Sequence, residues 1–470
     1  MKSNFLAIFI WAGLVVLGLA SGQRGPAADA PSRPNIVFIL ADDQGYQDVG
    51  CQGAEGIKTP RLDRMAQEGL RLTSFYVGAS CSPTRAAFMT GRYPGRYGIT
   101  RPINNPTGGL PPQEVTIAEL LKAQGYATGL IGKWHLGLTQ DKSPIAQGFD
   151  YYSGVPLSQI QRDPKAHAEY YKRQWRIQDA TGRNDVEHDP CEEQFTQRCT
   201  KEALAFIDRN KERPFFLYLA QLMVHVEVVA SPEFVGKSPR GVYGDACQEL
   251  DWSVGEVLDH LKKLGLDERT LVVYTSDNGG TTARNHVVPQ TSLASNLPLR
   301  GHKFQIWEGG NRVPCILRWP GQIPADRVSD EIVGVVDFLP TFAHLAGATV
   351  PQDRAVDGLN VWPFLHGDLP RSPRQTHSYY NASGAEAVRV GPWKLVGQNA
   401  LFNLQTELSE TTDVAAQHPD IVEQLRSFRA GVVAALKADN PLPLTPSLFA
   451  PKEYPAPAPD KLLAPGKRKQ

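Results

Sequence analysis

The chain has 470 residues, of which 41% are hydrophobic, and its 49 Lys plus Arg are balanced by 49 Asp plus Glu. The apolar content excludes a disordered or fibrous chain, and the balanced charge gives no global field that favours nucleic acid or an anionic membrane surface. The length suits one large domain with a smaller one. Any attraction of an anionic ligand must therefore be local.

The N-terminus predicts export. A short apolar run at residues 5–19 follows Met1 and Lys2, and small residues come after it. This layout is typical of a secretory signal peptide, so we expect cleavage of residues 1–20 and a periplasmic or extracellular protein, or a secretory or lysosomal one in a eukaryote. An uncleaved anchor or a lipid-modified terminus is the weaker alternative. No later stretch is apolar enough to span a bilayer, and no stable membrane insertion is expected.

Strand-like and helix-like segments alternate from residue 34 onward, which predicts an α/β sheet covered by helices on both faces. Buried strands are expected at residues 35–40, 126–131, 215–220 and 271–275. Helices are expected at residues 59–69, 116–124 and 247–261. Residues 150–200 are polar and break the alternation, so they predict either an insertion at the rim of a pocket or a surface excursion.

Two pairs of oxygen-bearing side chains directly follow predicted strands. Asp42 and Asp43 come after the first strand, and Asp277 and Asn278 come after the strand at residues 271–275. Neighbouring strand residues point to opposite faces, so two of them reach one ion only where the strand ends. Ligands bind at the carboxyl ends of strands in open α/β sheets, and oxygen donors favour Ca²⁺ over Mg²⁺. Each pair alone is more typical of a solvated turn.

Cys81 opens the string CSPTR at residues 81–85. Ser82 is a residue type that caps helices, Pro83 suits a first turn, and Gly91 suits a helix end. The spacing predicts that Cys81 lies at a helix N-terminus, where unpaired N–H groups and the helix dipole favour an anion. The alternative is a small buried hydrophobic side chain, which is the commonest state of a lone cysteine.

Further candidate groups lie in later loops. The string GKWHLG at residues 132–137 places Lys133 and His135 in one glycine-flanked loop, where a cation and a titratable base can face the same pocket. An ordinary surface loop is the alternative. His225 follows the strand at residues 215–220, and Lys303 lies farther along the chain. Each of these two, taken alone, is more typical of a structural or solvated side chain.

The six cysteines contain no zinc-binding pattern, since no CxxC pair or His/Cys cluster occurs. Cys191 and Cys199 lie close together in a polar segment and are able to form a disulfide in an oxidising compartment. The connectivity itself does not follow from the sequence.

The pattern changes after residue 365. Short strands at residues 387–390 and 393–396 precede a helix at residues 419–437, which predicts a small C-terminal α+β subdomain at residues 366–440. Residues 441–470 are rich in proline and predict an extended, partly disordered tail.

Two of these segments, the Cys81 string and residues 125–135, resemble the signature segments of type I sulfatases of the alkaline phosphatase superfamily. The likeness runs from about residue 35 to residue 396 and through the C-terminal subdomain. Within the family, the chain resembles the arylsulfatase A and N-acetylgalactosamine-6-sulfatase branch. It implies a catalytic domain at residues 32–365 with a large mixed β-sheet flanked by helices. In that family a maturase oxidises the cysteine to formylglycine, and this maturase is the one protein partner implied.

The resemblance also assigns roles to the candidate residues. It implies one Ca²⁺ held together with formylglycine at Cys81 by Asp42, Asp43, Asp277 and Asn278. Arg85 and Lys133 would orient the aldehyde hydrate, and Lys133 and Lys303 would neutralise the sulfate oxygens. One hydroxyl of the hydrate would attack sulfur. His225, alone or with Lys303, would protonate the leaving alcohol, and His135 would take the proton that lets sulfate depart.

Three departures from the family pattern occur. Gln47 stands where the family commonly has glycine, and no catalytic consequence is expected from this change. Thr84 stands where the family usually has serine, a change that the signature tolerates. Glu227 stands two residues after His225, where many members have proline.

The leading hypothesis is therefore an exported sulfatase that acts on a sulfated carbohydrate. A phosphodiester or phosphonate monoester hydrolase of the same superfamily is the first alternative, but a single ion with Lys133 and Lys303 favours sulfate. A non-catalytic protein that binds sulfated glycans, with Cys81 unconverted, is the second alternative. The presence of both histidines argues against it.

Overall fold

The computed structural model describes residues 33–443, apart from residue 106 and residues 159–173, 282–293 and 382–383. The predicted signal peptide at residues 1–20 and residues 444–470 of the predicted tail lie outside the described residues.

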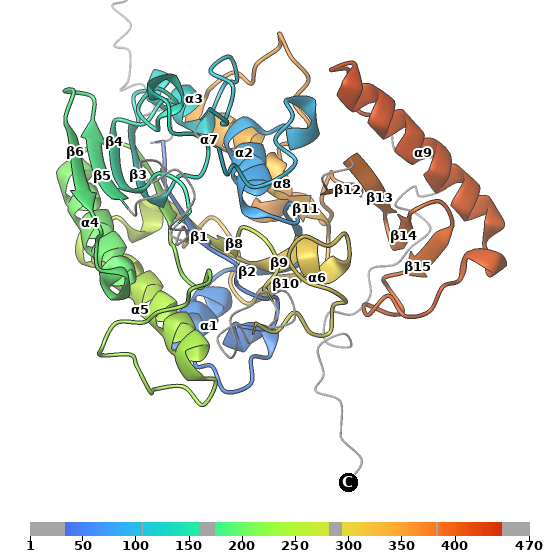
Figure 1. Cartoon of the computed structure of the whole chain (residues 1–470), viewed down its shortest axis with the longest axis horizontal. Coiled ribbons are helices and arrows are strands. Elements are labelled where there is room, and N and C mark those ends of the chain that lie inside the picture. Colours follow the sequence, from blue (N-terminus) through green and yellow to red (C-terminus); the bar gives the residue numbers. More distant parts are fainter. Residues whose placement is uncertain (1–32, 106, 159–173, 282–293, 382–383, 444–470) are drawn as a thin grey trace, which may run out of the picture. The chain divides into compact units, whose positions relative to one another are not determined.

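An 11-stranded mixed sheet forms the centre of the described chain (Figure 1). Its strands are β1 (Asn35–Ala41), β2 (Leu70–Tyr76), β3 (Ala127–Lys133), β4 (Tyr151–Val155), β5 (Gln174–Asp179), β6 (Asn184–His188), β7 (Phe215–Ala220), β8 (Thr270–Ser276), β9 (Arg312–Arg318), β10 (Arg327–Ser329) and β11 (Val333–Gly334). Their order is β10-β2-β9-β8-β1-β7-β3-β4-β5-β6, with β11 beside β2. The pairs formed by β8, β1, β7 and β3 are parallel, so the carboxyl ends of these four strands meet at one edge.

Helices cover both faces of this sheet, as the sequence predicts. Successive residues of β1 alternate between the two cores: Val37 and Ile39 belong to one, and Phe38 and Leu40 to the other. The first core includes residues of α1 (Pro60–Gln67), α4 (Phe195–Asn210) and α5 (Gly241–Lys263). The second includes residues of α2 (Cys81–Thr90), α3 (Ile117–Ala123), α7 (Phe338–Ala346) and α8 (Trp362–His366) (Figure 1). The parallel strands β1, β3, β7 and β8 are buried at every position and mostly apolar, as expected for strands that are covered on both faces.

Local signals place several helix ends correctly. Thr59 is the N-cap residue of α1, and α3 begins after Thr116 with the predicted capping box. In that box the Glu119 amide donates to Thr116 Oγ1 at 3.1 Å, and the Thr116 amide donates to Glu119 Oε2 at 2.7 Å. The reciprocal pair satisfies two amide groups that have no partner within the helix.

The described part of residues 150–200, which leaves out residues 159–173, is not a surface excursion, because β4, β5 and β6 extend the main sheet at one edge. All five residues of β6 are exposed, so this edge strand is polar and lacks the alternation that would identify it. The possible disulfide is also corrected: both cysteines carry free thiols. Cys199 is buried on α4, whereas Cys191 precedes the helix, is exposed, and donates to Glu193 at 3.2 Å.

A second, four-stranded antiparallel sheet follows residue 375. Its strands, in spatial order, are β12 (Thr376–Asn381), β13 (Gly384–Val390), β14 (Trp393–Val396) and β15 (Ala400–Asn403). Helix α9 (Pro419–Lys437) packs against β13 and lies along this sheet (Figure 1). This is the predicted α+β arrangement, with β12 and β15 added to the two predicted strands. The C-terminal subdomain was predicted to begin at residue 366, and His366 is the last residue of α8.

A buried set of charges and hydroxyls joins the two sheets. We call it the Glu308 cluster; its members are Tyr76, Glu308, Arg312, Tyr379, Lys394 and Glu410. Lys394 on β14 lies 3.0 Å from Glu308 Oε1 and 2.6 Å from Glu410 Oε1. The hydroxyls of Tyr379 and Tyr76 donate to the two Glu308 oxygens at 2.5 and 2.6 Å. Glu308 opens the short helix α6 (Glu308–Asn311), which directly precedes β9.

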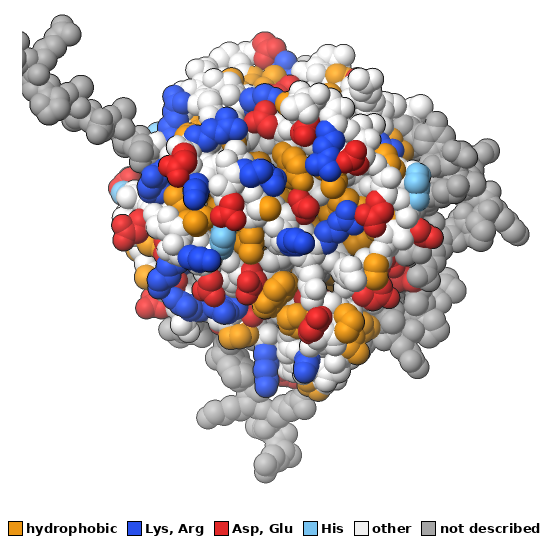
Figure 2. Space-filling view, turned by 90° about the vertical axis from the view of Figure 1, so that its left-hand side faces the viewer, with side chains coloured by type: hydrophobic (Ala, Val, Ile, Leu, Met, Phe, Trp, Pro, Cys, Tyr) orange, Lys and Arg blue, Asp and Glu red, His pale blue; other side chains and the backbone are white. Residues whose placement is uncertain are grey.

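The face shown in Figure 2 carries Lys and Arg side chains interspersed with Asp and Glu. This mixture agrees with the balanced composition and gives no patch of a single charge on that face. Within residues 33–443, apart from the gaps named above, no helix combines the length and apolar character that crossing a membrane requires.

Candidate active site

The two predicted pairs of oxygen ligands lie side by side. Asp42 and Asp43 follow β1, and Asp277 and Asn278 follow β8, whose last residue is paired in register with the last residue of β1. The Asp43 amide donates to Asp277 Oδ1 at 3.2 Å, and Asn278 Nδ2 donates to Asp43 Oδ1 at 2.8 Å. Asp43 has a φ of 63°, a left-handed conformation that turns the chain at the strand end. Neighbouring parallel strands therefore bring together carboxylates that are more than 230 residues apart.

Two buried lysines neutralise the first pair. Lys133 Nζ lies 2.5 Å from Asp42 Oδ2, and Lys303 Nζ lies 2.6 and 2.8 Å from the two oxygens of Asp43. Burial alone raises the pKa of Asp43, but Lys303 and then His225 outweigh it and hold that pKa well below its usual range. Burial lowers the pKa of Lys303, but the charge of Asp43 raises it above its ordinary value. The Lys303–Asp43 pair is therefore ionised at neutral pH.

Arg85 joins the two strand ends. Its Nη2 lies 2.7 Å from Asp277 Oδ2 and 3.6 Å from Asp42 Oδ2, and its Nη1 donates to the Lys133 carbonyl at 2.9 Å. All of these groups are buried. Burial and the neighbouring Asp42 raise the pKa of Asp277 to about 6, while Arg85 acts in the opposite direction. Arg85 thereby connects the ends of β1, β8 and β3.

Cys81 is the first residue of α2, as predicted, and only 2% of its surface is exposed. The helix ends at Gly91, whose φ of 66° suits glycine. Burial raises the pKa of the Cys81 thiol, although Lys133 and Lys303 act to lower it. The unmodified thiol is therefore protonated at neutral pH and is a weak nucleophile.

The predicted helix cap is wrong by two residues. The N-cap residue is Ser80, and no side chain caps the helix. Ser82 lies inside the first turn, where its hydroxyl donates to the His135 carbonyl at 2.9 Å and accepts from the Ile103 amide at 3.0 Å. Tertiary partners thus engage the hydroxyl that the sequence assigns to the cap.

His135 lies just beyond β3 and has a φ of 58°. Its Nε2 lies 3.2 Å from the Ile103 carbonyl, and its Nδ1 is buried without a hydrogen-bond partner among the described residues. Burial, with Lys133 and Arg85, lowers the pKa of His135 well below its usual value. The imidazole is neutral at physiological pH and is able to accept a proton.

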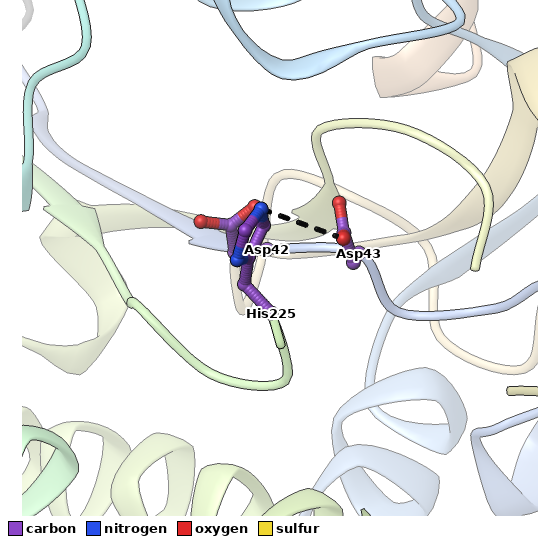
Figure 3. Close-up of side chains that lie close together, drawn as sticks. All are labelled: Asp42, Asp43 and His225. Atoms are coloured by element: carbon purple, nitrogen blue, oxygen red, sulfur yellow. Dashed lines mark ion pairs between the residues drawn. The ribbon is translucent and has the colours of Figure 1, made fainter. Parts of the chain in front are cut away.

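His225 comes from the loop after β7 and lies beside the first carboxylate pair (Figure 3). Its Nε2 is 3.8 Å from Asp43 Oδ2, and its Nδ1 is 2.6 Å from the Val226 carbonyl. Burial and then Lys303 lower the pKa of His225 to about 3, although Asp43 opposes this shift. The structure thus brings His225 to the same cluster as the other predicted residues.

The residues present fit a hard cation. Asp42, Asp43 and His225 each offer a ligand atom, and these atoms lie within 4.8 Å of one another (Figure 3). Two buried oxygens, Asp42 Oδ1 and Asn278 Oδ1, have no hydrogen-bond partner among the described residues. Buried polar atoms in native proteins are nearly always paired, so these two atoms mark a place for a ligand. Carboxylate and amide oxygens are the donors that Ca²⁺ prefers.

Sequence reasoning missed two contributors to the site. The Thr281 hydroxyl donates to Asp43 Oδ2 at 3.1 Å, and the Ile103 backbone contacts both His135 and Ser82. No motif surrounds Ile103, whose contribution is made by backbone atoms. Thr281 follows the pair of glycines after Asn278, and that closeness in sequence was the one available signal.

This fold and this site define a hydrolase of the alkaline phosphatase superfamily, and comparison with known families specifies it further. The Sulfatase family matches residues 34–348. The family described as N-sulphoglucosamine sulphohydrolase, C-terminal, matches residues 302–414. The chain belongs to the sulfatase family.

Individual relatives agree with this assignment. Steryl-sulfatase of Mus musculus is 37% identical over 444 residues, which cover 79% of this chain and 71% of the relative. N-acetylgalactosamine-6-sulfatase of Canis lupus familiaris is 40% identical over 410 residues, which cover 82% and 75%. The crystal structure of PsFucS1 sulfatase from Pseudoalteromonas sp. is similar with a TM-score of 0.78 and 30% identity, covering 87% of this chain and 91% of that one. The chain is therefore a sulfuric ester hydrolase, related to carbohydrate sulfatases.

Proposed function

We propose that this sulfatase removes sulfate from a carbohydrate monoester after a maturase converts Cys81 to formylglycine, and that it uses one Ca²⁺. The observation that carries the proposal is the position of Cys81 at the N-terminus of α2, buried within the electrostatic reach of Lys133, Lys303, Asp277 and Asp42. The thiol is a poor nucleophile there, whereas the hydrate of an aldehyde supplies an oxygen nucleophile at the same position.

The proposed ligands of Ca²⁺ are Asp42, Asp43, Asp277 and Asn278, with residue 81. The unpaired oxygens of Asp42 and Asn278 support this assignment. Three carboxylates in the site are already balanced by three basic side chains. A bound Ca²⁺ would supply the excess of positive charge that attracts a sulfate ester and polarises its oxygens.

The remaining roles belong to side chains of this chain. We assign Lys133 and Lys303 to the sulfate oxygens, because both ammonium groups already lie in the cluster around Cys81. Arg85 acts as a positioning residue, because it ties Asp277 to the Lys133 backbone. His135 is neutral, and its Nδ1 has no hydrogen-bond partner among the described residues, so we assign it the role of proton acceptor on the position of this free nitrogen. His225 is the candidate donor to the leaving alcohol.

The names of the relatives support the substrate class. One is named for sulfate at position 6 of N-acetylgalactosamine, and the structure of Ps i-CgsB, 32% identical, is in complex with k-i-k-neocarrahexaose, whereas the steryl-sulfatase relative is named for a sterol ester. Export through the predicted signal peptide would place this enzyme where polysaccharides are found. These observations together favour a sulfated glycan.

Sulfate release from a panel of defined sulfated saccharides and 4-nitrophenyl sulfate tests the proposal. The protein is co-expressed with a formylglycine-generating maturase, and the mass of the peptide containing residue 81 reports the conversion. We expect release by the converted enzyme and none by Cys81→Ala, which keeps the fold but offers no nucleophile. An aryl phosphodiester serves as the counter-substrate. Converted, calcium-loaded enzyme that cleaves the diester and no sulfate ester would overturn the proposal.

A further inference from the structure

Phe304 combines two unusual features beside the proposed site. Six large hydrophobic side chains are exposed among the described residues, and Phe304, at 49% exposed, is the one aromatic among them. Its φ is 71°, in the left-handed region that bulky residues rarely adopt and that glycine adopts without strain. Such a conformation persists only where the surroundings enforce it, and it is concentrated at functional sites. Of the seven non-glycine residues with a positive φ among the described residues, Asp43 and His135 belong to the proposed site.

The backbone holds Phe304 between the two loops that form the site. The Lys303 amide donates to the carbonyl of Gly280 at 3.4 Å, two residues after Asn278. The Phe304 amide donates to the carbonyl of Ala79 at 2.7 Å, two residues before Cys81. Phe304 therefore bridges the loop of the proposed ion ligands and the loop of the proposed nucleophile.

The ring of Phe304 lies at the border between the buried charges and solvent. The Lys303 ammonium, which is 3% exposed and contacts Asp43, lies 5.3 Å from the centre of this ring. A sulfate group held by Lys303 would direct the alcohol part of its ester outward from the buried site. The half-exposed ring of Phe304 lies beside the Lys303 ammonium and is available to that alcohol part.

We propose that Phe304 is a substrate-binding platform that stacks against the ring of a cyclic alcohol, either a pyranose or an aryl ring, in the sulfate ester. The proposal rests on the proposed function. Aromatic rings pack against flat apolar faces, and such contacts add binding that is the same in the ground state and the transition state. Phe304 would therefore determine substrate specificity and KM, and it would leave the chemistry at sulfur to the buried residues.

Replacement of the ring tests this inference. Phe304→Ala and Phe304→Tyr both keep an L side chain at the same φ, so they retain the same backbone strain and differ in the ring. We expect Phe304→Ala to lower kcat/KM about three- to tenfold through KM, with kcat nearly unchanged, and Phe304→Tyr to retain the wild-type value. The saccharide panel and 4-nitrophenyl sulfate are assayed separately, so that a loss confined to one names the ring that is recognised.

Inhibition by inorganic sulfate distinguishes a platform for the alcohol from a merely structural role of Phe304. This ion fills the sulfate position and has no alcohol part, so its inhibition constant should be the same in wild type and Phe304→Ala. Leu369→Ala is the matched control, because Leu369 is 45% exposed and lies outside the site. An equal weakening of sulfate inhibition, or an unchanged kcat/KM for both ring classes, would overturn the platform. Failure of converted wild-type enzyme to release any sulfate would instead overturn the proposed function, and the platform with it.

Discussion

The active site and the Glu308 cluster are both buried groups of opposite charges, yet they differ in how completely their polar atoms are paired. In the Glu308 cluster, Oε1 of Glu308 accepts from Tyr379 and Lys394, and Oε2 accepts from Tyr76. The Glu308 amide in turn donates to Glu410 at 2.8 Å. Every oxygen of Glu308 thus has a partner within the protein. Glu410 Oε1 has no hydrogen bond among the described residues, but it forms an ion pair with Lys394 Nζ at 2.6 Å.

In the active site, some buried polar atoms have no hydrogen-bond partner within the described part of the chain. Asp42 Oδ1, Asn278 Oδ1 and His135 Nδ1 are buried and have no hydrogen-bond partner among the described residues. Buried charge alone therefore does not identify a functional site, since both clusters have it. Single unpaired buried atoms also occur elsewhere among the described residues, for example Gln52 Nε2 and the Tyr126 hydroxyl. What sets the active site apart is that several unpaired atoms are grouped among its charged side chains, where a ligand would remove their desolvation cost.

The largest expected effect on activity distinguishes two buried lysines, one in each cluster. Lys303 and Lys394 are both buried and each contacts a carboxylate, so Lys303→Met and Lys394→Met form a matched pair. We expect Lys303→Met to lower kcat/KM on the order of a hundredfold or more, because it removes a cation from the proposed sulfate position. The folded fraction of Lys394→Met should keep its specific activity. Equal losses of sulfate release in the two variants would show that Lys303 has no special role in catalysis.

We expect a substitution in the Glu308 cluster to lower the stability of the folded protein more than it lowers activity. Lys394→Met leaves Glu308 and Glu410 in the interior without their shared ammonium, which should lower the free energy of unfolding by about 3–5 kcal/mol. Urea titration followed by circular dichroism measures this change. Lys263→Met, at an exposed position of α5, is the control and should change it by less than about 0.5 kcal/mol. A comparably small change in Lys394→Met would show that the cluster is not needed for stability.

We expect Ca²⁺ to bind in the active site, so its effect on stability should not depend on the Glu308 cluster. At a free Ca²⁺ concentration of about 100 times its Kd, binding should stabilise the folded state by about 2.7 kcal/mol, and removal by EGTA should abolish sulfate release. Thermal unfolding with and without the chelator measures the shift. Asp42→Asn should lose this calcium response and Lys394→Met should keep it. A response of full size in Asp42→Asn would place the ion elsewhere.

The pH dependence of stability offers a smaller and finer test. Burial alone raises the pKa of Glu308, but Lys394, Arg312 and Arg389 outweigh it and hold that pKa below its ordinary value of 4.5. The unfolded chain therefore binds the proton more tightly. The stability from this group is complete above about pH 4.5 and is lost as the pH falls below that value.

Two substitutions isolate this dependence. Glu308→Gln should flatten the loss of unfolding free energy between about pH 6 and pH 3.5. Burial raises the pKa of Glu410, which gives it the opposite sign, so Glu410→Gln should steepen the loss. Urea titrations at each pH measure both slopes. Identical slopes in the two variants and the wild type would mean that neither carboxyl titrates differently on folding.

Local rules in the sequence were sufficient for much of the architecture. Strand β7 has the predicted bounds, and α9 covers the predicted residues 419–437. The first prediction depends on a continuous apolar run and the second on a helical pattern after a proline. The polar strand β6 escaped the same reasoning because its side chains face water and its pairing partner is decided elsewhere in the chain.

The contacts of the site were only partly predictable. Ser82 has the chemistry of a helix cap, yet the backbone of Ile103 and His135 engages its hydroxyl. Phe304 has no signal in the sequence, because the exposure of a phenylalanine depends on what packs around it. Long-range contacts decide both cases, and a local pattern does not encode them.

The sequence by itself determined the type of the buried strands and helices that it predicted, the position of Asp42 and Asp277 at strand ends, and the placement of Cys81 at the start of a helix. Apolar patterning and the helix start and stop residues are enough for these features, although they misplaced the cap of α2 by two residues. The tertiary structure decided that Ala41 and Ser276 lie side by side and that Lys303 contacts Asp43. It also decided which buried oxygens have no partner. These features follow from the order of strands in the sheet, which is set by packing across the whole chain.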